Sequence, residues 1–201
     1  MSISESLLGK MKIHKIRLFF AYRAIIIQKE TESQGRCFHL EDISARTVRR
    51  LGHGILISPG MKQERGFIQH GDVSVLEHSF MVAVLCVAIA RRLPGKWDFS
   101  SLVRGALLHD YFLYDWHIKD PNRPAHATHH AAAALRNARR DFSLNPTEEN
   151  MIASHMFPLG GEWPGNKQSA VLWVADKVCA ARETVVGRLP RKWQGGIHPK
   201  I

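Results

Sequence analysis

The fold of this chain is decided by residues 74–95, SVLEHSFMVAVLCVAIARRLPG. Ser74 and Glu77 have the spacing of a capping box, in which each side chain accepts a hydrogen bond from the other residue's backbone N–H at the start of a helix. Apolar residues dominate from there to about Leu93, and Pro94-Gly95 is a pair that ends helices. This stretch therefore predicts a largely apolar helix over about residues 75–93.

Residues that start and stop helices recur through the rest of the chain. They predict four further helices, over about residues 101–113, 129–141, 146–155 and 168–186. The expected capping residues are Asp98 or Ser100, Thr128, Asn145 followed by Pro146, and, at the C-terminal end of the last helix, Gly187. No long alternation of apolar and polar residues predicts a strand. The sequence therefore predicts an all-α fold.

The length and composition fit a folded protein of one domain, or at most two small ones. The chain has 201 residues, of which 45% are apolar and 23% charged, so wholesale disorder is excluded. Glycines and prolines punctuate the sequence before residue 66. We expect an N-terminal basic helical extension over residues 1–65 that packs on the body, a helical body over 66–187 and a basic tail over 188–201.

Cysteine usage favours a reducing compartment. The three cysteines, Cys37, Cys86 and Cys179, are widely spaced and form no CxxC pair. Neither a disulfide framework nor a cysteine zinc site is expected, and Cys86 and Cys179 lie in apolar surroundings typical of buried residues. We predict a cytoplasmic location.

The net charge of +10 comes from the two ends of the chain. Residues 1–50 carry 10 basic and 5 acidic side chains, residues 182–201 carry 5 and 1, and residues 51–181 carry 13 and 12. A nucleic-acid-binding domain usually carries its basic stripe on the folded body. Because the body is nearly neutral here, we expect no specific nucleic-acid partner.

The N-terminal segment contains the apolar run LFFAYRAIII, residues 18–27, which Arg23 interrupts. A transmembrane helix needs about 20 apolar residues, and no small-residue cleavage site follows the run as in a signal peptide. We expect an amphipathic helix on the body, with weak contact to a membrane surface as the alternative. Met1 and Met11 are both open as the start residue.

Histidine is the unusual feature of the sequence, with twelve in the chain and eight of them between His70 and His155. Several lie within apolar helical stretches, where a polar ring needs a partner, and His109-Asp110 ends another such stretch. Asp176 also lies among apolar residues, where an uncompensated carboxylate would cost several kcal/mol to bury. Imidazole and carboxylate groups from different helices suit a shared transition-metal site.

The order of these residues resembles a known signature. His78, then His109-Asp110, then Asp176 on a late helix is similar to the pattern of the HD superfamily of metal-dependent phosphohydrolases. His130 and His155 resemble the further histidines of members that bind two metal ions. The similarity covers about residues 66–185 and implies an HD-domain-like helical bundle. An uncharacterised bacterial subgroup has motifs similar to QHGD (69–72), LHDYFLYDWH (108–117), HATHH (126–130) and HMFP (155–158).

The resemblance implies that one or two divalent ions are bound by His78, His109, Asp110, His130, His155 and Asp176. His109 and Asp110 would be catalytic. Asp110 would bridge the ions, with His130 and His155 on the second, and a hydroxide between the ions would attack a phosphate ester. Mn, Fe, Ni, Co, Zn and Mg are each compatible with parts of this set, and mixed histidine and aspartate ligands favour a transition metal.

Some residues near the motifs have less certain roles. The Gly-Lys that often follows the HD pair is replaced by Tyr-Phe-Leu-Tyr-Asp, so the role of that lysine is lost. Candidates for contacting the substrate are His126, Lys177, Lys119 and Arg123. His126, His129 and His130 compete as the third histidine; the subgroup's His-x-x-x-His spacing places His130 on the metal, His126 at the pocket rim and His129 in solvent. His70 is expected to form hydrogen bonds near the start of its helix.

Three function classes follow from this reading. The favoured class is a phosphomonoesterase or phosphodiesterase that acts on a small nucleotide or another phosphate ester. The alternatives are a di-iron HD-type oxygenase, which shares the ligand set, and a catalytically silent HD module that binds a ligand. The sequence does not indicate an oligomeric state.

Overall fold

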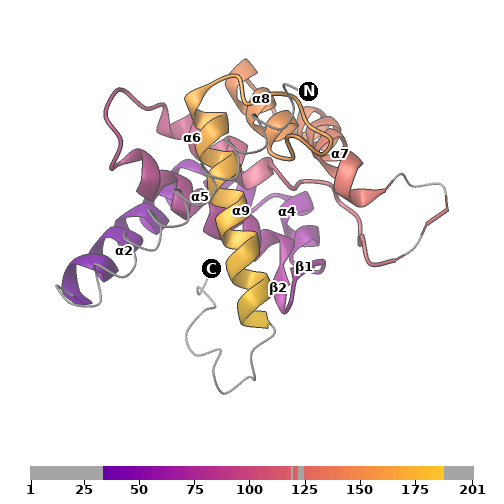
Figure 1. Cartoon of the computed structure of the whole chain (residues 1–201), viewed down its shortest axis with the longest axis horizontal. Coiled ribbons are helices and arrows are strands. Elements are labelled where there is room, and N and C mark those ends of the chain that lie inside the picture. Colours follow the sequence, from indigo (N-terminus) through magenta and orange to yellow (C-terminus); the bar gives the residue numbers. More distant parts are fainter. Residues whose placement is uncertain (1–33, 119, 122–124, 188–201) are drawn as a thin grey trace, which may run out of the picture. The chain divides into compact units, whose positions relative to one another are not determined.

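The computed structural model describes residues 34–118, 120–121 and 125–187 (Figure 1). The chain divides into two compact units, residues 1–42 and 43–201, and the second unit contains the elements that position the candidate site. The apolar run over residues 18–27, the basic tail over residues 188–201, and the candidate residues Lys119 and Arg123 lie outside the described residues.

Helices account for nearly all of the regular structure. They are α2 (Gln34–Leu51), α3 (His53–Leu56), α4 (Pro59–Glu64), α5 (Val75–Ala90), α6 (Phe99–Leu108), α7 (His126–Asp141), α8 (Pro146–Ser154) and α9 (Lys167–Gly187). The predicted all-α class is confirmed, since the described residues form eight helices and only a small two-stranded sheet. None of the helices in the described part of the chain has the length and apolar content needed to cross a membrane.

Helix α5 is the central helix of the bundle. It packs against α6 and α9, while α8 packs against α6, α7 and α9; Figure 1 shows α9 crossing α5. Residues on all sides of α5 are buried, including Phe80, Val82 and Val87, as in a helix enclosed by others. The apolar run quoted first in the sequence therefore forms the core of the fold.

Side chains cap three helices where the sequence predicts caps. Ser74 and Glu77 form the capping box of α5, and Asn145 forms a second capping box, with Pro146 as the first residue of α8. Of the two candidates for α6, Asp98 is the cap, since its side chain accepts a hydrogen bond from the backbone N–H of Ser101. Such caps depend on neighbouring residues alone, which is why the sequence predicts them.

The predicted C-terminal ends of α5 and α6 are wrong. Helix α5 ends at Ala90 instead of Leu93, and α6 spans Phe99–Leu108 instead of 101–113. Beyond α6 the chain turns: the backbone N–H of Phe112 donates to the carbonyl of Asp110 at 2.8 Å, and Leu113 has a φ of 61°. That left-handed conformation cannot continue a right-handed helix.

The predicted start of α7 is also wrong. The helix begins at His126, three residues before the expected start, and Thr128 lies inside its first turn. The Thr128 hydroxyl donates to the carbonyl of Ala125 at 3.1 Å instead of accepting a hydrogen bond from a backbone N–H. No side chain caps α7, so the capping residues in the sequence do not predict where this helix begins.

A short hairpin precedes α5 and was not predicted. Strands β1 (Ile68–His70) and β2 (Val73–Ser74) pair antiparallel and are too short to show an alternating pattern. Gly71 has a φ of 59°, a conformation that glycine adopts without steric cost. The hairpin brings Gln69 and His70 close to the start of α5.

The compact unit begins at Ile43, upstream of residue 66, where the sequence analysis places the start of the body. Ile55 of α3 and Met61 of α4 are buried in the same core as α6. At Gly52 a Cβ atom would lie 2.2 Å from a side-chain carbon of Leu107, so this segment approaches α6 closely. The glycines and prolines before residue 66 separate short core helices.

Candidate metal centre

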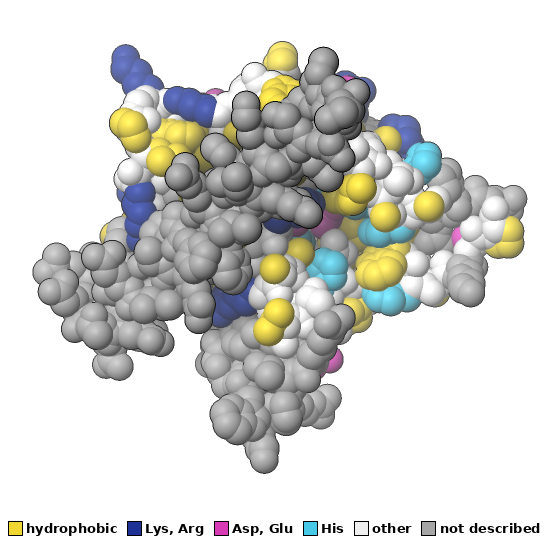
Figure 2. Space-filling model, viewed as in Figure 1, with side chains coloured by type: hydrophobic (Ala, Val, Ile, Leu, Met, Phe, Trp, Pro, Cys, Tyr) yellow, Lys and Arg dark blue, Asp and Glu magenta, His cyan; other side chains and the backbone are white. Residues whose placement is uncertain are grey.

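Six polar side chains lie together inside the bundle, and none of these residues is more than 5% exposed. They are His78 on α5, His109 and Asp110 at the end of α6, His130 on α7, His155 at the end of α8, and Asp176 on α9. Figure 2 shows histidine side chains gathered on one face of the molecule, among hydrophobic side chains. The structure thus brings together every metal ligand that the HD resemblance implies.

One part of this cluster, which we call the His78 half, joins two rings and two carboxylates. Asp176 Oδ1 lies 3.2 Å from His78 Nε2 and 3.8 Å from His109 Nε2. Asp110 Oδ2 lies 3.8 Å from His78 Nε2 and 3.4 Å from His109 Nε2. All four groups therefore direct a nitrogen or oxygen atom toward a common space.

The other part, the His130 half, uses the second oxygen of the same carboxylate. Asp110 Oδ1 lies 3.3 Å from Nε2 of His130 and 3.3 Å from Nε2 of His155, and these two nitrogens are 2.9 Å apart. His78, His109 and Asp110 form one group that could hold an ion, and Asp110, His130 and His155 form another. Asp110 is therefore shared between the halves.

Hydrogen bonds at Nδ1 set the orientation of the rings. In three of the histidines Nδ1 lies 2.8 Å from a backbone carbonyl oxygen: Ala106 for His109, His126 for His130, and Ile152 for His155. A carbonyl oxygen only accepts, so Nδ1 carries the proton. In the neutral ring Nε2 then has a lone pair, which is directed into the cluster, as in histidines that bind a metal.

Each of these nitrogens needs a positive partner, which is either a proton or a metal ion. Nε2 of His130 and Nε2 of His155 face each other, and no proton lies between two neutral rings whose Nδ1 atoms are protonated. Nε2 of His109 and Oδ1 of Asp110 are buried without a hydrogen-bond partner among the described residues, which is costly. Two nitrogens at about 2.1 Å from one ion and about a right angle apart are separated by about 3 Å. The donor set therefore fits divalent metal ions.

The carboxylates of the cluster are held in their charged form. Burial raises the pKa of Asp110, but the neighbouring histidines, with His109 foremost, together outweigh burial and hold the pKa well below its usual range. For Asp176, hydrogen bonds with His109 and His78 outweigh burial in the same way. Burial lowers the pKa of His155, which keeps that ring neutral and able to bind a cation.

Two residues that orient the candidate ligands were not among the predicted site residues. Gln69 Nε2 donates to Asp110 Oδ2 at 2.6 Å, and Glu183 Oε2 lies 2.8 Å from His78 Nδ1. Glu183 follows Asp176 by seven residues, about two helical turns, so the spacing places both on one face of α9. That signal is present in the sequence, whereas the ring that Glu183 contacts depends on how α9 packs on α5.

Glu64 supports the turn that follows the HD pair. Its side chain is fully buried, and the backbone N–H of Leu113 donates to Oε1 at 2.7 Å. Burial raises the pKa of Glu64 to about 8. No sequence signal pointed to this residue, because residue 64 falls in the predicted N-terminal extension.

Two half-buried histidines flank the cluster. His126, predicted at the pocket rim, stacks on His130 with ring centroids 4.4 Å apart, and its Nδ1 lies 3.0 Å from the Tyr114 hydroxyl. His70 meets the ring of His78 edge-on at 5.7 Å, and burial lowers its pKa. One histidine thus stands beside each half of the cluster.

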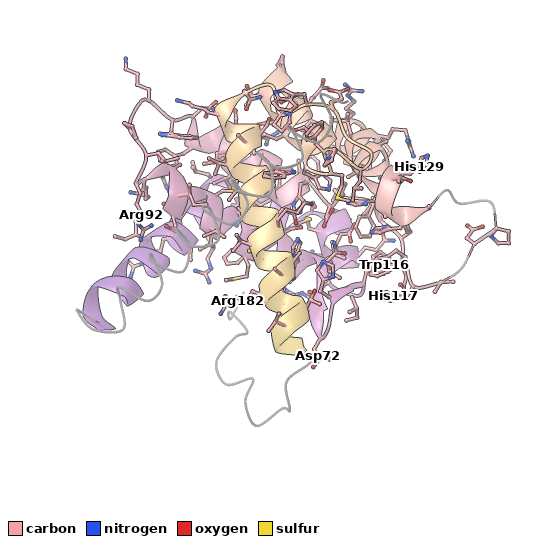
Figure 3. All side chains as sticks on the ribbon, in the orientation of Figure 1. Asp72, Arg92, Trp116, His117, His129 and Arg182 are labelled. Carbon is pink, nitrogen blue, oxygen red and sulfur yellow. The ribbon has the colours of Figure 1, made fainter. Side chains whose placement is uncertain are left out.

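The remaining histidines of the motifs lie at the surface. Figure 3 shows His129 on the first turn of α7, and Trp116 and His117 side by side in the loop before it. The rings of Trp116 and His117 stack with centroids 3.9 Å apart. His129 and His117 are exposed and contribute no atom to the cluster.

Of the three cationic residues predicted to contact the substrate, Lys177 is the one that the structure describes. Its Nζ lies 2.7 Å from Asp176 Oδ2 and 3.4 Å from the sulfur of Met156, and 41% of the side chain is exposed. Lys177 thus neutralises the outer oxygen of Asp176 while Oδ1 faces the rings. Lys119 and Arg123, the other two cationic candidates, are not among the described residues.

Comparison with known proteins finds no relative: no protein-family model matches the chain, and neither a curated protein nor a solved structure does. The functional argument therefore depends on the chemistry of the cluster. Its contents are four imidazoles and two carboxylates, with Glu183, Gln69 and Lys177 immediately around them.

Proposed function

We propose that this protein is a metal-dependent phosphohydrolase of the HD type that acts on a small nucleotide or another phosphate ester. The observation that carries the proposal is the His130 half, where two lone-pair nitrogens face each other 2.9 Å apart beside a shared carboxylate. The order of His78, His109-Asp110 and Asp176 along the chain supports the same class. Cys86 and Cys179 are buried free thiols, which supports a cytoplasmic location.

In the proposed enzyme the two halves hold one divalent ion each, with Asp110 common to both. Such ions supply Lewis acidity toward phosphoryl oxygens and lower the pKa of water to near neutrality. The chain fixes the ligands in place: backbone carbonyls hold three rings, Glu183 holds His78, and Gln69 holds Asp110. Phosphoryl transfer depends mainly on such positioning and charge stabilisation.

Groups beside the cluster suit an anionic substrate. Lys177 pairs with Asp176 and contacts the sulfur of Met156, and because its side chain is partly exposed, it can also meet a phosphate bound beside the cluster. His126 stands next to His130 and presents a half-buried ring. In the proposed enzyme these two residues contact the substrate, and His129 does not.

The first test is elemental analysis of the purified protein, followed by a hydrolysis screen over nucleotides and chromogenic phosphate esters with different divalent ions. We expect bound transition metal, and release of phosphate or of a monoester without consumption of oxygen. Turnover that requires both iron and dioxygen would identify an oxygenase instead. Stabilisation by a ligand with no turnover would identify a binding module.

The second test uses the shared carboxylate. Asp110→Ala removes a ligand from both halves, and Asp110→Asn keeps the shape but loses the negative charge, so both should reduce turnover about a thousandfold or more. His129 belongs to the HATHH motif but is exposed, so turnover by His129→Ala should stay within a few-fold of wild type. Near-normal turnover by Asp110→Ala, free of wild-type contamination, would contradict the proposed function.

A further inference from the structure

The four histidines of the cluster are not held in the same way. Three rings give Nδ1–H to a backbone carbonyl, whereas Nδ1 of His78 lies 2.8 Å from a carboxylate oxygen of Glu183. Both side chains are buried, with 0% of His78 and 7% of Glu183 exposed. Because a backbone carbonyl is enough to orient an imidazole, orientation alone does not explain why Glu183 lies at His78.

What Glu183 adds is negative charge, and it adds this charge to one half of the cluster. Asp176 and Glu183 flank the two nitrogens of the His78 ring, with Asp176 Oδ1 3.2 Å from Nε2. In the His130 half, by contrast, Asp110 is the one acidic member of the group that could hold an ion. The His78 half therefore has two carboxylates of its own in addition to the shared one.

A carboxylate at the far nitrogen also changes the ligand itself. Its hydrogen bond to Nδ1–H fixes the tautomer and makes Nε2 a stronger base, and changes to such outer partners typically cost about 10–100-fold in metal affinity. Two carboxylates buried against one ring would be an expensive arrangement without a compensating cation. Both effects favour a cation at His78.

We propose that Glu183 is a positioning residue that makes the His78 half the tighter of the two metal positions, so that the first divalent ion binds there. This inference rests on the proposed metal centre and adds the order in which its positions fill. The His130 half then binds the second, more weakly held ion.

The test is a titration of the metal-free full-length protein with Co(II), followed by visible absorption and by competition with a chelator of known affinity. Glu183→Gln keeps the length of the side chain and an oxygen that accepts from Nδ1, but it removes the charge. We expect its first ion to bind about 10–100-fold more weakly than in wild type. Glu183→Asp, which keeps the charge, should recover part of this loss.

A matched control makes the same change at a partly exposed surface carboxylate. Glu149 on α8 pairs with Arg139 at the surface, so Glu149→Gln should bind the first ion as wild type does. His155→Ala removes a ligand from the His130 half, and it should abolish the second ion while leaving the affinity for the first within about threefold. Circular dichroism shows that each variant is folded.

Two results would overturn the inference. One is an affinity for the first ion that Glu183→Gln leaves unchanged, and the other is loss of the first ion in His155→Ala. Wild-type protein that binds no Co(II) would contradict the metal centre itself. The failure of the inference and the failure of the proposed function are therefore separate observations.

Discussion

Metal binding to this cluster should release protons, and the structure gives their number. Burial lowers the pKa of His78, but hydrogen bonds with Asp176 and Glu183 outweigh burial and raise the pKa to about 9. For His109, burial also lowers the pKa, but the charges and hydrogen bonds of Asp110 and Asp176 together outweigh burial and raise the pKa to about 10. At pH 7 both rings of the metal-free protein therefore carry a proton on Nε2, the nitrogen that would bind the ion.

The magnitude follows from counting these protons. Each proton that an ion must displace changes the apparent affinity about tenfold per pH unit. Displacement from both His78 and His109 therefore predicts that the apparent Kd of the first ion falls about 100-fold per pH unit between about pH 7 and pH 9. Histidines with the ordinary pKa of about 6.5 would give almost no change over this range.

Isothermal titration calorimetry in buffers of different ionisation enthalpy measures the protons released per ion. At about pH 7.5 we expect about two protons for the first ion, and the same number for His129→Ala, whose changed residue is exposed. Tight binding with no proton release would contradict the raised pKa values of His78 and His109.

The same two groups connect stability to pH. A histidine whose pKa in the folded protein exceeds its value of about 6.5 in the unfolded chain stabilises the fold below that pH. This contribution disappears as the pH rises through about 9 for His78 and about 10 for His109. An ion competes with these protons, so adding metal should raise Tm more at pH 8.5 than at pH 6.5 in thermal melts.

Two further predictions concern residues around the cluster. Burial raises the pKa of Glu64 from 4.5 to about 8, so its proton stabilises the fold at low pH and the contribution falls as pH rises. Between pH 5.5 and pH 8 the free energy of unfolding of the wild type should fall by about 3 kcal/mol more than that of Glu64→Gln. Urea unfolding at several pH values measures this difference, and parallel pH profiles of the two proteins would contradict it. A Cβ atom at Gly160 would lie 2.3 Å from the backbone oxygen of Thr128, so Gly160→Ala should cost about 1–3 kcal/mol. Gly54→Ala, with nothing within 4 Å of the new atom, should not lower Tm.

The sequence predicts those parts of the fold that depend on neighbouring residues. Ser74, Asp98 and Asn145 each cap a helix through a side chain that reaches only three residues along the chain. Helix α7 has no such cap, and its start was predicted three residues late. The hairpin at Gly71 was missed because two short strands show no periodicity.

In the cluster too, some features can be predicted from the sequence and others depend on how the helices pack. The six candidate ligands and their order are predicted from the sequence through the HD resemblance, and the structure brings these residues together. The partners of the rings are different, because a backbone carbonyl such as that of Ala106 has no sequence signature. Glu183 has the right spacing from Asp176, but its contact with His78 exists only once α9 packs on α5.

The helix end that the sequence analysis placed wrongly is part of how the site is built. The last carbonyl groups of a helix lack intrahelical partners, and α6 and α8 end beside His109 and His155. Ala106 and Ile152, in the last turns of these helices, supply carbonyl oxygens to the two Nδ1 atoms. Both helix ends also place the negative end of a helix dipole at the cluster, which favours a cation there.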